Sequence, residues 1–249
     1  IRSIDDKKIS KNAIKVLSKL QDKGFQGYLV GGCIRDLLIG SQPKDFDIAT
    51  NAHPERIREL FSNARIIGRR FKIVHVRFEN EIIEVSTFRK SDSKDLENNQ
   101  TEAGMIISDN TFGSLEEDSL RRDFRINSIY YNPLSKELID LQDGLADVYA
   151  GVVKSIGEPD LRLREDPVRM LRAIRIGSKL EFSLEKEIKE SIRSLGYLIQ
   201  DVSPARLFDE SLKMFMGGFG VKVYLALKEL DLFNWIFPES ARSQKKYNL

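Results

Sequence analysis

Alternation of apolar and polar positions in the first third of the chain predicts a β-sheet. Five short segments are expected to form strands: residues 28–30, 45–49, 65–67, 72–78 and 81–88. Glu79 and Asn80 form the expected hairpin turn between the last two strands. Three segments are expected to form helices: residues 9–23, 33–39 and 54–61. Ser10 or Asn12 is the expected N-cap of the first helix, and Pro54 opens the third.

The rest of the chain follows a different pattern. Residues 91–110 are mainly polar and are expected to form a loop. From about Pro167 the apolar positions recur mainly at helical spacing. A mixed sheet followed by helices is an α+β arrangement. A chain of 249 residues suits about two domains. We expect the first over residues 1–157 and the second, helical one over residues 158–249.

Composition limits the class of protein without identifying it. The formal net charge of +2 is too small to indicate nucleic-acid binding by itself. Basic residues gather in two runs, residues 65–77 and 162–179, and either run could bind phosphate or form a solvated face. Cys33 is the only cysteine, which excludes an internal disulfide and fits a reducing, cytoplasmic location. No apolar run approaches about 18 residues, so no membrane span is expected. Both ends of the chain are expected to be cut rather than natural.

Residues 29–50 concentrate charged residues and glycines in one short segment. Asp45 and Asp47 alternate with an apolar residue, so both carboxylates should project from one face of a strand. Two close carboxylates repel each other unless a cation lies between them, and Mg²⁺ binds through one or two carboxylates plus substrate phosphates. Gly31 and Gly32 lie upstream, where a tight turn lets backbone N–H groups approach a triphosphate. A lone Asp-x-Asp or Gly-Gly is weak evidence, and the ordered combination carries the prediction.

A third acid is expected to complete the metal site. Glu84 interrupts an otherwise apolar strand, where a carboxylate must face a polar site or destabilise the fold. The alternative is a charge on an edge strand that faces solvent. Glu81 is the competing acid, but it lies at the expected turn.

A later acidic and basic cluster reads Arg-Glu-Asp-Pro-Val-Arg over residues 164–169. Asp166 and Arg169 are three residues apart, so in a helix they share a face. A carboxylate acceptor and a guanidinium donor could there contact the edge of a base. The structural alternative is that Asp166 caps a helix with Pro167 at its first position, and the residue could do both.

Several motifs in order resemble the class II tRNA nucleotidyltransferase and poly(A) polymerase family. They are Gly-Gly-x-x-Arg-Asp at 31–36, Asp-x-Asp at 45–47, Arg-Arg-Asp-x-x-x-Asn at 121–127, and Glu-Asp-x-x-Arg at 165–169. Arg206 and Glu210 resemble the family's last motif, which braces the base-reading helix. The resemblance covers about residues 9–238. It implies a nucleotidyltransferase (polymerase beta-like) head with a mixed β-sheet, followed by an all-helical neck and body that recognises the base and binds RNA.

The resemblance also implies a role for each matching residue. The acids Asp45, Asp47 and Glu84 would hold two Mg²⁺ ions, and the phosphates would meet Gly31, Gly32 and Arg35. The ribose would meet Arg122 and Asp123, which would select ribonucleotides over deoxyribonucleotides. The base would meet Asp166 and Arg169, with Glu165 orienting the arginine. The rest of the expected nucleotide-binding set is Asn127 and Arg172.

Within the family the chain looks most like the bacterial poly(A) polymerases. Residues 65–76 and 113–118 look like that branch, whereas CCA-adding enzymes usually carry Gly-x-x-His-Gly-Thr at the place of the first. This implies transfer of AMP from ATP to RNA 3′ ends. CCA addition to tRNA is the alternative, and a catalytically inactive RNA-binding module is the second alternative.

Overall fold

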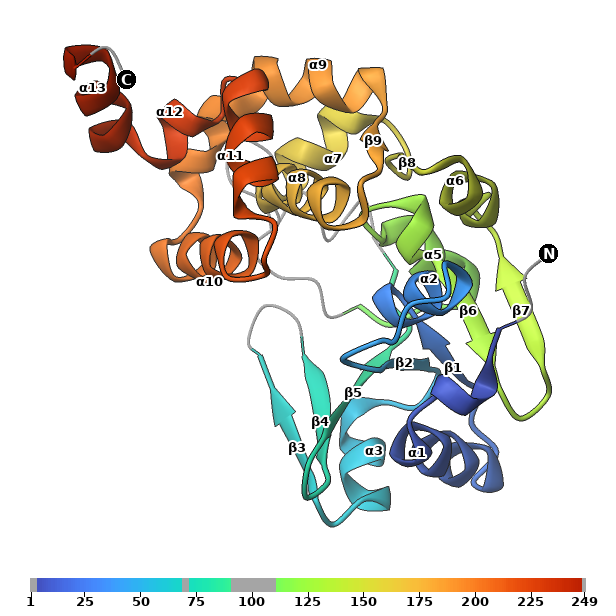
Figure 1. Cartoon of the computed structure of the whole chain (residues 1–249). Coiled ribbons are helices and arrows are strands. Elements are labelled where there is room, and N and C mark those ends of the chain that lie inside the picture. The colour runs from blue at the N-terminus through green and yellow to red at the C-terminus, as the bar shows by residue number, and fades with distance from the viewer. Residues whose placement is uncertain (1–3, 69–71, 91–110, 248–249) are drawn as a thin grey trace. The chain divides into compact units, whose positions relative to one another are not determined.

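The computed structural model describes residues 4–68, 72–90 and 111–247, without the side chains of residues 244, 245 and 247 (Figure 1). The polar segment 91–110, which is expected to be a loop, lies outside the described residues, as do Arg69 and Arg70 of the first basic run. The chain forms two compact units, one ending at Tyr149 and one beginning at Ala150. The expected domain boundary, after residue 157, lies a few residues beyond this observed boundary.

A seven-stranded sheet is the framework of the first unit. In spatial order its strands are β3 (Ala64–Ile67), β4 (Ile73–Arg77), β5 (Ile82–Thr87), β2 (Asp47–Thr50), β1 (Gly27–Val30), β6 (Ile129–Asn132) and β7 (Glu137–Asp140). Neighbouring strands are antiparallel except β2 and β5, which are parallel. This confirms the mixed sheet. Strand β6 was not predicted, because all four of its residues are buried and alternation is lost.

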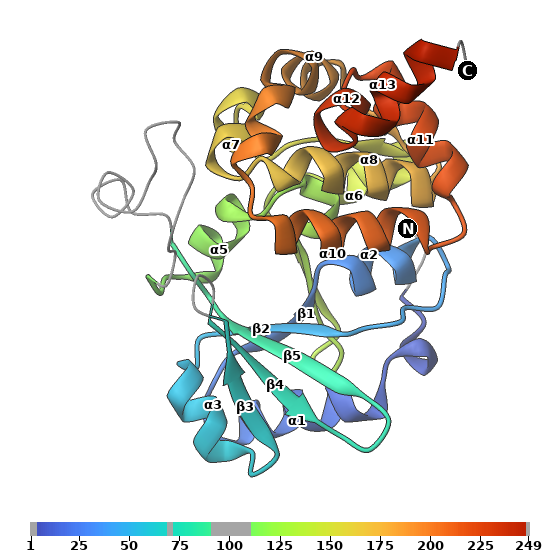
Figure 2. The same cartoon turned by 90° about the vertical axis from the view of Figure 1, so that its left-hand side faces the viewer.

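Helices cover both faces of this sheet. They are α1 (Lys11–Asp22), α2 (Gly32–Leu38), α3 (Pro54–Leu60), α5 (Leu115–Arg121) and α6 (Gly144–Ala150), with 3₁₀ turns η1 (Asp6–Lys8) and η2 (Arg125–Asn127). Figures 1 and 2 show α1 and α3 together on one face. Ser10 caps α1 by accepting hydrogen bonds from the N–H groups of Asn12 and Ala13, as expected. Pro54 opens α3, also as expected.

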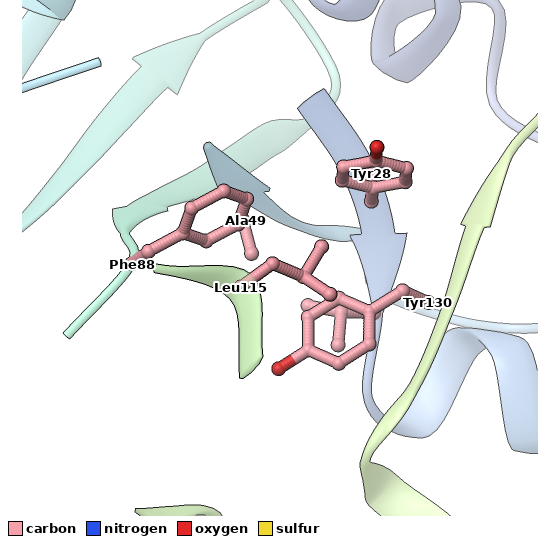
Figure 3. Close-up of a cluster of buried hydrophobic side chains, with 6 residues drawn as sticks. Tyr28, Ala49, Phe88, Leu115 and Tyr130 are labelled. Atoms are coloured by element: carbon pink, nitrogen blue, oxygen red, sulfur yellow. The ribbon is translucent and has the colours of Figure 1, made fainter. Parts of the chain in front are cut away.

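The opposite face of the sheet carries a separate apolar cluster (Figure 3). Gly27 approaches Leu17 of α1, so the alternate residues Tyr28 and Val30 of β1 point to the other face. There they pack with residues of β2, β6, α5 and the end of β5: Ala49, Tyr130, Leu115 and Phe88. The Tyr28 ring meets the Tyr130 ring edge-on at 6.4 Å between centroids. This cluster anchors α5, which leads into the Arg-Arg-Asp segment.

The second unit is mainly helical, as expected from the spacing of apolar positions, but it is not all-helical as the resemblance implies. Its helices are α7 (Pro159–Glu165), α8 (Val168–Leu180), α9 (Lys186–Leu195), α10 (Pro204–Phe215), α11 (Gly220–Glu229), α12 (Phe233–Ile236) and α13 (Pro238–Tyr247), with the 3₁₀ segment η3 (Gly196–Asp201). Two short parallel strands, β8 (Val152–Val153) and β9 (Ser183–Leu184), complete it. Helix α8 buries one face and contacts α7, α10 and α11. Within the described residues, no helix combines the length and apolar character needed to cross a bilayer.

Two local expectations are wrong. The strand expected over residues 45–49 begins only at Asp47, because its partner β1 ends at Val30, opposite Asp47, where the chain turns. Asp45 therefore precedes the strand. Asp166 does not cap α8, whose N-cap position is Pro167 without a side-chain bond. The Asp166 carboxylate is bound to Arg206 instead.

Candidate active site

The turn between β1 and α2 brings backbone close to a carboxylate. Gly31 has φ 83° and ψ −141°, a conformation that is strongly disfavoured for residues other than glycine. A Cβ atom on Gly31 would lie 3.6 Å from Oδ2 of Asp47. Burial, and then the charge of Asp47, raise the pKa of the Cys33 thiol to about 12. Asp47 thus lies beside the first turn of α2.

Asp47 and Glu84 are neighbours across β2 and β5, the parallel pair within the seven-stranded sheet. Asp47 of β2 is in register with Glu84 of β5, so their side chains share a face of the sheet. The next pair along, Ile48 and Val85, is buried on the opposite face. Glu84 is about half exposed, and its Oε1 lies 3.2 Å from Nε2 of His75 without the alignment of a hydrogen bond. The register brings together two acids that are far apart in sequence.

The competing acid has a structural role. Glu81 Oε2 accepts hydrogen bonds from Ser10 Oγ at 2.6 Å and from Asn12 Nδ2 at 3.0 Å. Glu81 therefore joins the start of β5 to the first turn of α1. Between the two alternatives, only Glu84 lies in register with Asp47.

Asp45 is exposed and is separated from Asp47 by the buried Phe46. No group of three or more acidic, histidine or cysteine side chains in the described ranges is gathered closely enough to hold a metal ion. The full cage of three acids is thus not formed. Mg²⁺ needs only one or two protein carboxylates when substrate phosphates supply the rest, and Asp47 with Glu84 offers a hard, oxygen-only donor set of that kind. The residues present therefore fit a magnesium site that is completed by substrate.

Two glycines and Arg35 were expected to meet the phosphates. A Cβ atom on Gly32 would lie 3.4 Å from Nη2 of Arg35, so these residues are adjacent. Arg35 is buried and donates hydrogen bonds to Asp36 Oδ1 at 2.6 and 2.9 Å and to Asn127 Oδ1 at 2.6 Å. Arg35 therefore joins α2 to η2 in this structure, and its contact with phosphate stays a prediction.

A chain of hydrogen bonds continues from Arg35 to Asp123. Asn127 Nδ2 donates to Asp123 Oδ1 at 3.2 Å, and the same oxygen accepts from the N–H group of Phe124 at 2.8 Å. The Asp123 carboxylate is thus oriented from two sides. Asn127 is only 6% exposed, so its side-chain amide is directed to Asp123 and not to solvent.

A fully buried carboxylate lies beneath the Arg-Arg-Asp segment. Asp118 accepts hydrogen bonds from Arg121, Arg122 and Tyr130. Burial by itself would raise the pKa of Asp118, but the positive charges of Arg122 and Arg121 hold it far below its usual value. The same burial disfavours charge on Arg122, and Asp118 outweighs it and raises the Arg122 pKa. The sequence interpretation gave Asp118 no role at the site, although its spacing of four residues from Arg122 was a usable signal.

In the second unit, the Glu-Asp-x-x-Arg residues are held by ion pairs. Arg169 Nη1 donates to Glu165 Oε2 at 3.1 Å, so the orienting contact implied by the resemblance is present. Asp166 binds both terminal nitrogens of Arg206 at 2.9 Å in a bidentate pair.

Helix α10 braces α8 through separate partners. Glu210 of α10 is buried, and its Oε2 accepts from Nε of Arg175 at 2.8 Å, while its Oε1 lies 4.0 Å from Nη1 of Arg172. Arg206 and Glu210 thus each contact the α8 region, rather than serving only their own helix.

Gly31→Ala is expected to destabilise the protein and to place a methyl group against Asp47. A left-handed backbone costs an L-residue about 1–3 kcal/mol. The new methyl group would also contact the Asp47 carboxylate. We expect a lower thermal midpoint and a larger loss of nucleotide incorporation than the stability change explains.

Gly24→Ala is the matched control. Gly24 has φ 80°, but its Cβ position has nothing within 4 Å, so the substitution brings the strain without the contact. Equal loss of incorporation in the two variants, at equal thermal midpoints, would contradict a special role for Gly31.

Comparison with known proteins gives matches over most of the chain. A family model described as the poly A polymerase head domain matches residues 27–154. A second, described as the probable RNA and SrmB-binding site of polymerase A, matches residues 181–243. Poly(A) polymerase I of Haemophilus influenzae is 48% identical over 239 residues, which cover 94% of this chain and 53% of the relative.

More distant relatives belong to the tRNA-processing branch. The CC-adding tRNA nucleotidyltransferase of Halalkalibacterium halodurans is 35% identical over 228 residues, covering 92% of this chain and 54% of the relative. The crystal structure of the Bacillus stearothermophilus CCA-adding enzyme in complex with CTP has a TM-score of 0.76 at 32% identity, covering 88% of this chain and 52% of that chain. The chain spans about half the length of the curated relatives it matches.

Proposed function

This chain belongs to the poly(A) polymerase family, and from that premise we propose that it forms the catalytic part of a template-independent RNA nucleotidyltransferase. The reaction joins AMP from ATP to an RNA 3′ end and releases pyrophosphate. The observation that carries this proposal is the 48% identity to poly(A) polymerase I over 94% of the chain, against 35% for the CC-adding relative.

The acids of the first unit are the proposed metal ligands. Asp47 and Glu84, in register on one sheet face, and Asp45 just upstream would hold two Mg²⁺ ions. Bound there, the ions supply Lewis-acid activation of the 3′-hydroxyl and neutralise charge on the triphosphate. No side chain has to act as a general base, since phosphoryl transfer depends mainly on positioning and charge neutralisation.

The protein's own groups would bind and orient the nucleotide. The backbone at Gly31 and Gly32 is free of side chains and can approach phosphates closely. Arg122 and Asp123 would contact the ribose, and both are held by neighbouring side chains. A site built to bond a hydroxyl rejects a substrate that lacks it, which favours ribonucleotides.

The second unit would recognise the base and bind RNA. Asp166, Arg169 and Arg172 are the proposed base-recognition residues, and their ion pairs with Arg206, Glu165 and Glu210 support them. RNA binding by the region after residue 181 is proposed from its match to the family's RNA-binding model.

One incorporation assay tests this function. Full-length protein and Mg²⁺ are incubated with each labelled NTP singly, on an oligo-A primer and on tRNA that lacks its CCA end. Long tails formed with ATP alone are the expected result. CCA addition, which the CC-adding and CCA-adding matches make the second candidate, would give short products that need CTP. Absence of incorporation under all conditions would support an inactive RNA-binding module.

A further inference from the structure

Arg122 is held in a closed group of hydrogen bonds by two buried partners, Asp118 and Tyr130. Its Nε donates to Tyr130 Oη at 2.9 Å and to Asp118 Oδ2 at 3.1 Å, and its Nη2 donates to the same Asp118 oxygen at 2.8 Å. Tyr130 completes the group by donating to Asp118 Oδ2 at 2.8 Å. Two bonds along one edge of a planar guanidinium fix both its position and its tilt.

The groups that hold Arg122 are themselves rigid. Asp118 is 0% exposed, and Tyr130 is likewise buried, in the apolar cluster of the sheet (Figure 3). Burial is the main reason that the pKa of the Tyr130 phenol is raised; the charge of Arg122 lowers it and that of Asp118 raises it, and burial prevails. The hydroxyl therefore stays protonated and keeps its hydrogen to donate to Asp118. Arg121 binds the second Asp118 oxygen at 2.8 Å and prevents the carboxylate from rotating.

Arg122 nevertheless reaches the surface, since 17% of its side chain is exposed. The arrangement is a buried support beneath a partly exposed arginine side chain, as expected where a side chain must meet a ligand in one fixed orientation.

We infer that Asp118 and Tyr130 are positioning residues which set ribose discrimination by fixing the Arg122 guanidinium. This inference rests on the proposed function, in which Arg122 contacts the ribose. A guanidinium that is held at one place loses its hydrogen bond to the nucleotide when the 2′-hydroxyl is absent. A mobile guanidinium can instead shift to other acceptors. Loosening Arg122 should therefore reduce selectivity for ATP over dATP more than it reduces turnover with ATP.

Tyr130→Phe is the sharpest test, because it removes one hydroxyl and leaves the ring in the core. The expected result is a fall of about tenfold in the ratio of kcat/KM for ATP to that for dATP. The loss of kcat/KM with ATP should appear mainly as a higher KM. The thermal midpoint should confirm that the variant is folded. An unchanged ratio in the folded variant would overturn the inference.

Tyr131→Phe is the matched control. Tyr131 is the next residue of β6, points to the opposite face, and its hydroxyl donates to Asp6 at 2.9 Å. The same chemical change there should leave the ATP to dATP ratio as in the natural protein. An equal change in both variants would show a general effect of loosening β6 and would overturn the inference.

A double-variant cycle with Arg122→Lys separates positioning from general stability. If Tyr130 acts through Arg122, Tyr130→Phe should change the ratio little when Lys replaces the arginine. Additive effects would overturn the inference. Calorimetry gives the ratio of the affinities for ATP and dATP without any turnover. If the natural protein proved inactive, that result would contradict the proposed function alone. The ratio of affinities in the natural protein and in Tyr130→Phe would still decide this inference.

Discussion

Asp45→Asn and Asp47→Asn are each expected to lower nucleotide incorporation by about a thousandfold or more, since loss of a proposed metal ligand would remove several kcal/mol of transition-state stabilisation. Asparagine keeps the volume of each side chain but removes the charge that binds a divalent ion. Asp45 is exposed and Asp47 half-buried, so the thermal midpoint should change by only about 1–2 °C. Primer extension with labelled ATP, together with thermal unfolding, measures both quantities.

Asp143→Asn is the control for these two variants. Asp143 is exposed, lies between β7 and α6, and has a φ of 57° that asparagine tolerates. It should retain full activity. Full activity in Asp47→Asn would refute the metal site, and full activity in Asp45→Asn alone would reduce it to Asp47 and Glu84.

Asp118→Ala is expected to destabilise the first unit by about 3–5 kcal/mol, because it leaves two arginines without their shared buried anion. The thermal midpoint should fall by about 10 °C. Asp22→Ala, at the exposed end of α1, should leave the midpoint nearly unchanged. Chemical denaturation that gives equal stabilities for Asp118→Ala and the natural protein would contradict the role of Asp118.

The Asp118 carboxylate should make the free energy of unfolding depend on pH in a specific way. The pKa of Asp118 is lowered in the folded state, so its stabilisation is present above the unfolded pKa of about 3.9 and is lost as the pH falls through the folded pKa. The stability difference between the natural protein and Asp118→Asn should therefore be constant from about pH 8 to about pH 5. It should shrink below about pH 4. A difference that disappears already near neutral pH would contradict this assignment.

Local sequence signals were sufficient for most single elements up to residue 88. Ser10 and Pro54 start their helices where short-range capping rules place them. Strands β4 and β5 follow from alternation and a turn between them. These features depend on a few neighbouring residues, so the sequence contains all the information they need.

Long-range pairing decided the rest. The sequence offered both Glu81 and Glu84 as the third acid, and only the parallel register of β2 with β5 places Glu84 beside Asp47, while Glu81 binds α1. Strand β2 begins at Asp47 because its partner ends at Val30, a limit set by a strand distant in sequence.

The sequence by itself determined the order of the motifs, the α+β class and the pair of acids around Phe46. Only the tertiary structure showed that Asp118 and Tyr130 lie beneath Arg122, and that Arg206 binds Asp166 from another helix. The physical reason is that burial and ion pairing depend on which distant surfaces meet. A charged residue in a sequence looks the same whether it is solvated or enclosed, and its environment fixes its role only after the chain has folded.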